Sequence, residues 1–189
     1  MLARVDSTNA DIAAVDAQIG QHVTPFADAA ARLDQIPGIG PTAAAIIIAE
    51  IGVDMTRFPT PAHLASWAKF APGINSSAGK TNDNGSTGHG NRYLARVLGE
   101  AAVCAGRTDT FLGARYRRLL HRRGKKKAIV AVGQSLLVII WNLLADPNTH
   151  LHDLGSDHYH RHINTHTKRR NHVRQLEALG YHVTLEPAA

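Results

Sequence analysis

The fold is decided by residues 33–52, which read LDQIPGIGPTAAAIIIAEIG. Pro41 suits the first position of a helix, and Gly52 closes that apolar helix at its C-terminal side. The preceding IPGIG run predicts a tight turn. The pattern is typical of a helix–hairpin–helix, in which the amides of Gly38 and Gly40 and the N-terminus of the second helix hold one DNA phosphate. The alternative is an ordinary helical hairpin that uses its glycines only for the turn.

A second run, residues 72–92, places two adjacent serines, Ser76 and Ser77, in a glycine-rich loop. A serine hydroxyl is a poor nucleophile and needs activation or positive charge nearby to attack a phosphate. The glycines allow the backbone to approach a phosphate closely. Three cations are candidates for stabilising the developing charge: Lys80, Arg92 and Arg96. The alternative is a polar loop that only joins two helices.

The densest positive charge lies in residues 115–127, where eight of thirteen residues are Lys or Arg. Such density neutralises nucleic-acid phosphates and makes binding steeply dependent on salt. The alternative is a solvated helix face followed by a loop. The candidate nucleic-acid-binding residues in this segment are Arg115, Arg117, Arg118, Arg122, Arg123, Lys125, Lys126 and Lys127.

Composition limits the classes of protein to which this chain can belong. The chain has 189 residues, a formal net charge of +6 and 44% hydrophobic residues, which favours a polyanionic partner and allows a real core. The single cysteine, Cys104, excludes a disulfide within the chain, fits a reducing cytoplasmic compartment and is expected in the core. The apolar run over 128–145 contains amide side chains and predicts a buried core helix, so no membrane partner is expected.

The N-terminal residues 7–23 predict a helix with Ile12, Val15 and Ile19 on one stripe. The same spacing continues toward Ile36 in a heptad-like register, and Pro25 is expected to kink or split the helix. The stripe predicts a homo-oligomer that pairs through this helix. The alternative is packing onto the chain's own core.

The predicted fold class is mainly α. Its expected parts are a coiled-coil-like helical segment, a helical domain and a polar His-rich tail that is partly ordered, over residues 1–32, 33–146 and 147–189. Further helices are expected over 61–70, with Thr60 as its cap and Trp67 on its apolar side, and over 91–106, 110–121 and 168–179. Strand-like alternation is confined to 181–185.

Histidines crowd residues 150–172, and some of their spacings suit a transition metal. Structural zinc sites, however, use cysteine or a better-defined set of four ligands. We therefore assign no metal ligand in this chain.

Four pieces of sequence occur in an order and spacing that resemble a known family. They are IPGIGPTA at 36–43, LASWAKFAP at 64–72, SSAGK at 76–80, and GHGNRYL at 88–94 followed by Ala101 and Ala102. Together they resemble the C-terminal transposase domain of the IS110/IS116/IS902 family of insertion-sequence transposases. The resemblance spans residues 33–145 and extends into the tail.

The resemblance implies a DNA transposase, or recombinase, with a serine that forms a covalent phosphoserine link to cleaved DNA. It makes Ser77 the first choice for the nucleophile and Ser76 the alternative. Members of the family also carry an N-terminal RuvC-like domain with an acidic cluster for a divalent metal, and some use a structured guide RNA. No such domain precedes the hairpin here, so a RuvC-like partner is expected and no cofactor is assigned to this chain. The other hypothesis is a non-catalytic helical module that binds DNA or RNA.

Overall fold

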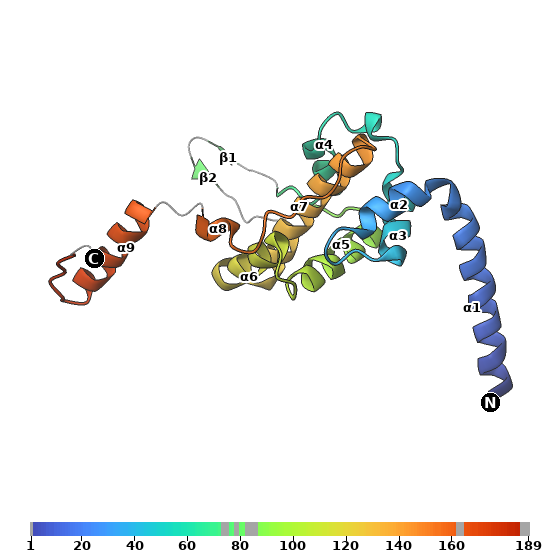
Figure 1. The fold of residues 1–189 in the computed structure, drawn as a ribbon, viewed down its shortest axis with the longest axis horizontal. Coiled ribbons are helices and arrows are strands. Elements are labelled where there is room, and N and C mark those ends of the chain that lie inside the picture. Colours follow the sequence, from blue (N-terminus) through green and yellow to red (C-terminus); the bar gives the residue numbers. More distant parts are fainter. Residues whose placement is uncertain (1, 73–75, 78–79, 82–86, 162–164, 186–189) are drawn as a thin grey trace.

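The computed structural model describes residues 2–72, 76–77, 80–81, 87–161 and 165–185. These residues are mainly helical, which confirms the predicted fold class. A compact group of helices lies between α1, which projects at one end, and α9 at the other (Figure 1). The described elements are α1 (Leu2–Val23), η1 (Thr24–Phe26), α2 (Ala27–Asp34), α3 (Pro41–Ile51), η2 (Met55–Arg57), α4 (Pro61–Trp67), β1 (Ser76–Ser77), β2 (Lys80–Thr81), α5 (Arg92–Ala105), α6 (Phe111–Arg123), α7 (Lys125–Ala145), α8 (His158–Arg161) and α9 (Thr165–Ala178).

Helix α7 is the centre of the core. It packs against α2, α4, α5 and α6, and its buried side includes Val132, Leu136 and Ile140. Among the described helices it alone is long and apolar enough to cross a membrane, but this packing accounts for its apolar character. The helix begins three residues earlier than predicted, because Gly124 (φ +81°) turns the chain out of α6 and accepts the first α7 hydrogen bond from the amide of Ala128.

Helices α2 and α3 pack against each other as a helical hairpin, and the tight turn predicted for residues 36–40 lies between them. Pro41 begins α3 and Gly52 follows it with φ +79°, as expected. Gly38 has φ +92°, and a Cβ there would lie 2.4 Å from the carbonyl oxygen of Ala101 on α5. Packing against α5 is therefore enough to require this glycine. Contact between the hairpin and DNA stays a prediction.

Helix α1 exposes its apolar stripe. Its residues are all described and none is buried, so the alternative that this stripe packs onto the chain's own core is wrong for Ile12, Val15 and Ile19. The same register enters the core only after the 3-10 turn that contains Pro25, where Ala29 and Leu33 are buried. The predicted break at Pro25 is confirmed, while the helix begins at Leu2 rather than at residue 7.

Several local predictions are wrong. Cys104 is exposed, because it lies at the edge of the arc that α5 buries. Thr60 does not cap α4 through its side chain; its hydroxyl lies 2.8 Å from Nδ1 of His63. Trp67 is exposed rather than enclosed by the core. Residues 181–185 form no strand, and the described strands are instead the short pair β1 and β2.

The segment after α4 packs directly on the backbone of α7, at a glycine of that helix. Phe70 is buried, and its ring lies where a side chain at Gly133 would stand, 2.3 Å from the position of a Cβ. Gly99 on α5 has its nearest neighbour, Cγ2 of Ile129, at 3.8 Å from the corresponding position. The two glycines are both inside helices, so they provide a matched pair.

We expect Gly133→Ala to lower the free energy of unfolding by about 1–3 kcal/mol, because the ring of Phe70 must move. Gly99→Ala should be neutral or stabilise the protein by up to about 1 kcal/mol, since it gains helix propensity without a clash. Chemical denaturation of both variants measures the difference. Equal effects of the two substitutions would show that the Phe70 contact is not a packing constraint.

Candidate nucleic-acid interface

The two candidate serines lie in a short hairpin. Strands β1 and β2 are antiparallel, and their register pairs Ser76 with Thr81 and Ser77 with Lys80. Residues 73–75, 78–79 and 82–86, which complete the loop, lie outside the described residues. The backbone register thus brings the first-choice serine opposite one of the predicted cations.

Both ends of this loop lie at one groove. Pro72, the last described residue before the loop, and Thr87, the first after its last gap, line the same hollow of about 420 Å³. The other described residues of its wall come from the first three turns of α7, namely Lys126, Lys127, Val130, Ala131 and Gln134. We call this hollow the basic groove. The loop that carries the serines therefore leaves and re-enters the fold beside two lysines.

Close backbone contacts hold the two ends together. A Cβ at Gly90 would lie 2.5 Å from the carbonyl oxygen of Ala68, and one at Gly88 would lie 3.3 Å from the side chain of Lys69. Lys69 itself has φ +59°, and the next amide, that of Phe70, donates to the carbonyl of Ala65 at 2.9 Å. The segment after α4 thus crosses the segment before α5, and this crossing forms the root of the serine loop.

Asn91 holds in place the segment before α5, which forms one side of the root of the serine loop. Its Oδ1 accepts hydrogen bonds from the amides of Tyr93 (2.9 Å) and Leu94 (3.1 Å), which caps α5. Its Nδ2 donates to the carboxylate of Glu50 on α3. One side chain therefore connects the serine loop, α5 and the α2–α3 hairpin.

The predicted basic segment divides into two halves. In the first half the arginines bond within the fold. Arg117 donates to the carbonyl oxygens of Gly106 (3.0 Å) and Thr108 (2.8 Å) after α5, and Arg115 donates to the hydroxyl of Tyr159 at 3.1 Å. The guanidinium of Arg118 lies 4.6 Å from the centre of the Tyr159 ring. These contacts give the three arginines a structural role.

The second half has no such partners in the part of the chain that the structure describes. Its five cations are exposed and form no hydrogen bond or ion pair with another described residue; they are Arg122, Arg123, Lys125, Lys126 and Lys127. Three of them lie in the first turn of α7, where the helix dipole is already positive. This unfavourable concentration of charge is relieved when an anion binds. We call these five residues the free cation cluster.

The two predicted cations on α5 are partly engaged. Arg96 forms an ion pair with Glu100 at 3.4 Å, and both side chains are largely exposed. Arg92 donates to the hydroxyl of Tyr93 at 2.7 Å and lies over the same ring, 4.7 Å from its centre. Such exposed contacts contribute little stability, so both arginines can still turn toward a phosphate.

Sequence reasoning missed that part of the tail docks on α6. The carboxylate of Asp153 accepts a hydrogen bond from the amide of Phe111 at 3.0 Å, at the start of α6. The ring of Tyr159 stacks on that of Phe111, with centres 5.4 Å apart and planes at 19°. Tyr159, the one Phe, Trp or Tyr residue among the histidines of residues 150–172, was the available signal, but its partner Phe111 is about fifty positions away in the chain.

The described titratable groups with shifted pKa values lie outside the basic groove. A hydrogen bond from the side chain of Thr56, and a second from its amide, lower the pKa of Asp54. The amide of Asn148 and then the hydroxyl of Thr149 lower the pKa of Asp146. Both carboxylates stabilise turns, which explains their shifts without a catalytic role.

The basic groove does not suit a metal. Its lining residues in the described part of the chain supply two ammonium groups and amide and hydroxyl oxygens, without a carboxylate, imidazole or thiol. Within the described residues, no group of three or more His, Cys, Asp or Glu side chains is placed to hold a metal ion. The divalent metal that the family resemblance implies thus has no fitting site in this part of the chain.

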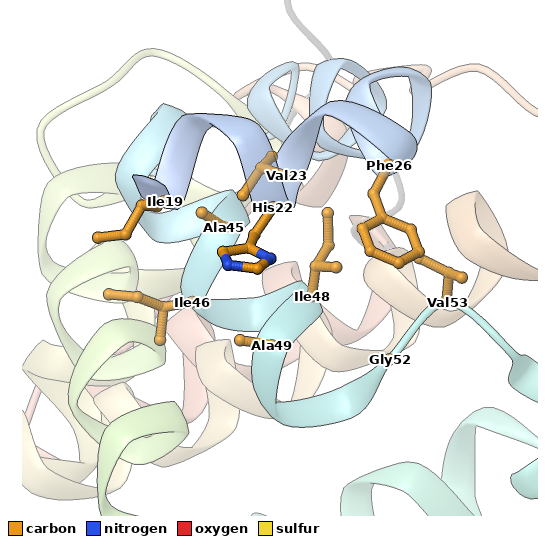
Figure 2. Close-up of a pocket in the computed structure, with 10 residues that line it drawn as sticks. All are labelled: Ile19, His22, Val23, Phe26, Ala45, Ile46, Ile48, Ala49, Gly52 and Val53. Atoms are coloured by element: carbon orange, nitrogen blue, oxygen red, sulfur yellow. The ribbon is translucent and has the colours of Figure 1, made fainter. Parts of the chain in front are cut away.

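A second hollow, of about 590 Å³, is apolar and lies between α1 and α3. Figure 2 shows Ile19, Val23 and Phe26 on one side of it, facing Ile46 and Ile48 on the other. His22 also lines the hollow. The exposed stripe of α1 is continuous with this apolar surface.

The comparisons with known proteins agree with the geometry. A helical core that presents a serine loop at a basic groove is compatible with a domain that acts on DNA, and residues 30–117 match the profile of the Transposase IS116/IS110/IS902 family. This match confirms the predicted resemblance to that family for residues 30–117. The chain is also 32% identical, over 116 residues, to "Insertion element IS110 uncharacterized 43.6 kDa protein" of Streptomyces coelicolor. That alignment covers 60% of this chain and 28% of the relative, so the chain corresponds to less than a third of its length.

We expect Arg117→Ala to lower the free energy of unfolding by about 1–2 kcal/mol, because two carbonyl oxygens lose a charged donor. Arg122→Ala, in the same helix but without a partner among the described residues, should change it by less than about 0.5 kcal/mol. Urea denaturation of both variants tests this division of the basic segment. If Arg122→Ala destabilises the protein as much as Arg117→Ala, the division is wrong.

Proposed function

We propose that this chain is the serine-bearing part of a DNA transposase that cleaves and rejoins the DNA of an insertion sequence. Ser77 is the proposed nucleophile and Ser76 the alternative. One observation carries the proposal: both ends of the loop that contains these serines lie at the basic groove, beside Lys126 and Lys127. The match of residues 30–117 to a transposase family supports the same substrate.

The free cation cluster would hold the DNA backbone. Its five cations have no partner among the described residues, and two of them, Lys126 and Lys127, line the groove. Such a cluster favours phosphates over a neutral partner, and its binding would weaken steeply as salt rises. The proposed site also includes Lys80, Arg92 and Arg96 as charge-stabilising groups. The amides of Gly38 and Gly40, at the start of α3, remain a candidate contact with a further phosphate.

The proposed step is an in-line displacement at phosphorus. The serine oxygen forms a bond to the phosphorus of the scissile phosphate and loses its proton to a general base. The bond from phosphorus to one deoxyribose oxygen breaks, and that oxygen takes up a proton and leaves as a hydroxyl. Nearby cations offset the charge that develops on the phosphoryl oxygens. Attack by a deoxyribose hydroxyl on the phosphoserine reverses the chemistry and rejoins the strand.

The complete reaction would need a RuvC-like domain, from a longer protein or from a separate chain. This domain, rather than the described groove, would hold the divalent metal. A structured guide RNA is a further proposed partner, which the free cation cluster could contact through its phosphates. Without these parts, binding of DNA by this chain is expected to be stronger than its chemistry.

The test is a covalent adduct. We expect the chain, incubated with a RuvC-like partner, guide RNA and cognate DNA, to form a protein–DNA adduct that survives denaturation. Ser77→Ala should abolish the adduct, because no oxygen remains to bond to phosphorus, while DNA affinity stays within about twofold of the unsubstituted chain. Ser76→Ala is the matched control and should retain it.

Other outcomes of this experiment are decisive. Loss of the adduct only in Ser76→Ala moves the nucleophile by one residue. An adduct that persists in both variants contradicts the serine mechanism. DNA binding that depends on Arg122 and Arg123, without any adduct under any condition, would identify the chain as the non-catalytic module.

We further propose that α1 pairs with α1 of a second copy of this chain. The stripe of Ile12, Val15 and Ile19 is exposed, and alanines such as Ala10 lie on the opposite face of the helix. Pairing would cover the stripe and stabilise a helix that packs on little else within the described chain.

Ile12→Asp should convert the paired chain to a monomer, because the new charge would be buried in the helix pair. Ala10→Asp adds the same charge to the opposite face and should leave the oligomer intact. Analytical ultracentrifugation of the two variants measures the outcome. A monomeric unsubstituted chain at tens of micromolar, or dissociation in both variants, would overturn the pairing.

A further inference from the structure

We infer that Trp67 and Tyr93 form a stacking site for unpaired nucleobases beside the root of the serine loop. The inference rests on the proposed function in one respect, namely that the ligand is a nucleic acid. It adds a contact with bases to the phosphate contacts described above. Neither residue belongs to the sites assigned so far.

Exposure singles out these two rings. The helical core between residues 27 and 146 contains seven aromatic residues, all of them described. Five are buried or half-buried, whereas Trp67 is 43% and Tyr93 53% exposed. Covering a tryptophan or tyrosine ring is favourable, so these two exposed rings would gain free energy from a partner that stacks on them.

The two rings lie on either side of the serine loop along the chain. Trp67 is the last residue of α4 and Tyr93 the second residue of α5, so the two rings flank the serine loop in the chain. The contact of Gly90 with the Ala68 carbonyl brings the two flanks together at the loop root. Each ring therefore lies within three residues of the crossing from which the serine loop emerges.

The surroundings of both rings suit a nucleobase. The guanidinium of Arg92 lies 4.7 Å from the centre of the Tyr93 ring and bonds to its hydroxyl, which holds the ring in place. The ring of Trp67 packs against that of Phe58 at a tilt of 58°, with centres 5.4 Å apart, and its indole N–H donates to no other described residue. Both rings are thus supported on one side and exposed on another.

Charge decides between a nucleic acid and a protein partner. Lys69 and Arg92 lie at the loop root, and Lys126 and Lys127 line the adjacent groove. Aromatic rings interleaved with cations hold single-stranded nucleic acids, because rings stack on bases while cations contact phosphates. Stacked bases next to a scissile phosphate would keep the strand ends in place between cleavage and rejoining.

The test separates bases from phosphates. The full chain is titrated with a fluorescently labelled oligothymidylate of about 12 nucleotides, and with an abasic strand of the same length and charge, at one fixed salt concentration. We expect the oligothymidylate to bind about 25-fold more tightly, since two stacked bases each contribute about fivefold. Binding should also quench the emission of Trp67.

Matched variants identify the rings. Trp67→Ala and Tyr93→Ala should each reduce the ratio of the two affinities about fivefold and leave abasic binding unchanged. Trp67→Phe and Tyr93→Phe retain a ring and should retain most of the ratio. Coincident thermal transitions of the alanine and phenylalanine variants establish that all four are folded.

Equal affinity for the two strands, or an affinity ratio that survives both alanine substitutions, would overturn the stacking site. Neither result bears on the covalent adduct, which is measured with Ser77→Ala. Failure of the adduct, in turn, leaves this binding ratio untouched. The two proposals therefore fail separately.

Discussion

The contact between the Phe70 ring and the bare backbone of Gly133 determines where the serine loop leaves the helical core. Phe70 is two residues before Pro72, and Gly133 is one helical turn from Ile129 and Val130 on the side of α7 that leads to its lysines. A larger residue at 133 would push this segment away from α7. Because Gly133 has no side chain, Phe70 can pack closely on α7. This packing positions the serine loop beside the lysines at the start of α7.

The basic residues of α6 and of the start of α7 fall into two groups, one that packs within the fold and one that is exposed. Arginines in the middle of α6 bond to carbonyl groups just after α5 and hold the tail, whereas the free cation cluster surrounds Gly124 and has no partner among the described residues. A protein that needed only stability would not place three lysines at the positive end of its central helix. The proposed DNA contact explains why three lysines stand at this electrostatically unfavourable place.

Much of the fold could be predicted from sequence because its signals are local. Pro41 and Gly52 bracket α3, and the helix expected over residues 91–106 is α5. The misses involve partners distant in the chain. Nothing near Trp67 or Cys104 indicates their exposure, and the bond of Arg117 to the end of α5 requires the packing of α6 on α5. The candidate serines came from residue type and family resemblance, whereas the position of the two loop ends, Pro72 and Thr87, at the basic groove is apparent only in three dimensions.

The most direct measurement is peptide mass spectrometry of the denatured protein–DNA adduct after digestion with protease and nuclease. The account predicts a nucleotide remnant joined through a phosphoester to Ser77, within a peptide that spans the loop between Pro72 and Thr87. A remnant on a residue outside that loop, or a complete reaction that leaves no remnant on the protein, would contradict it.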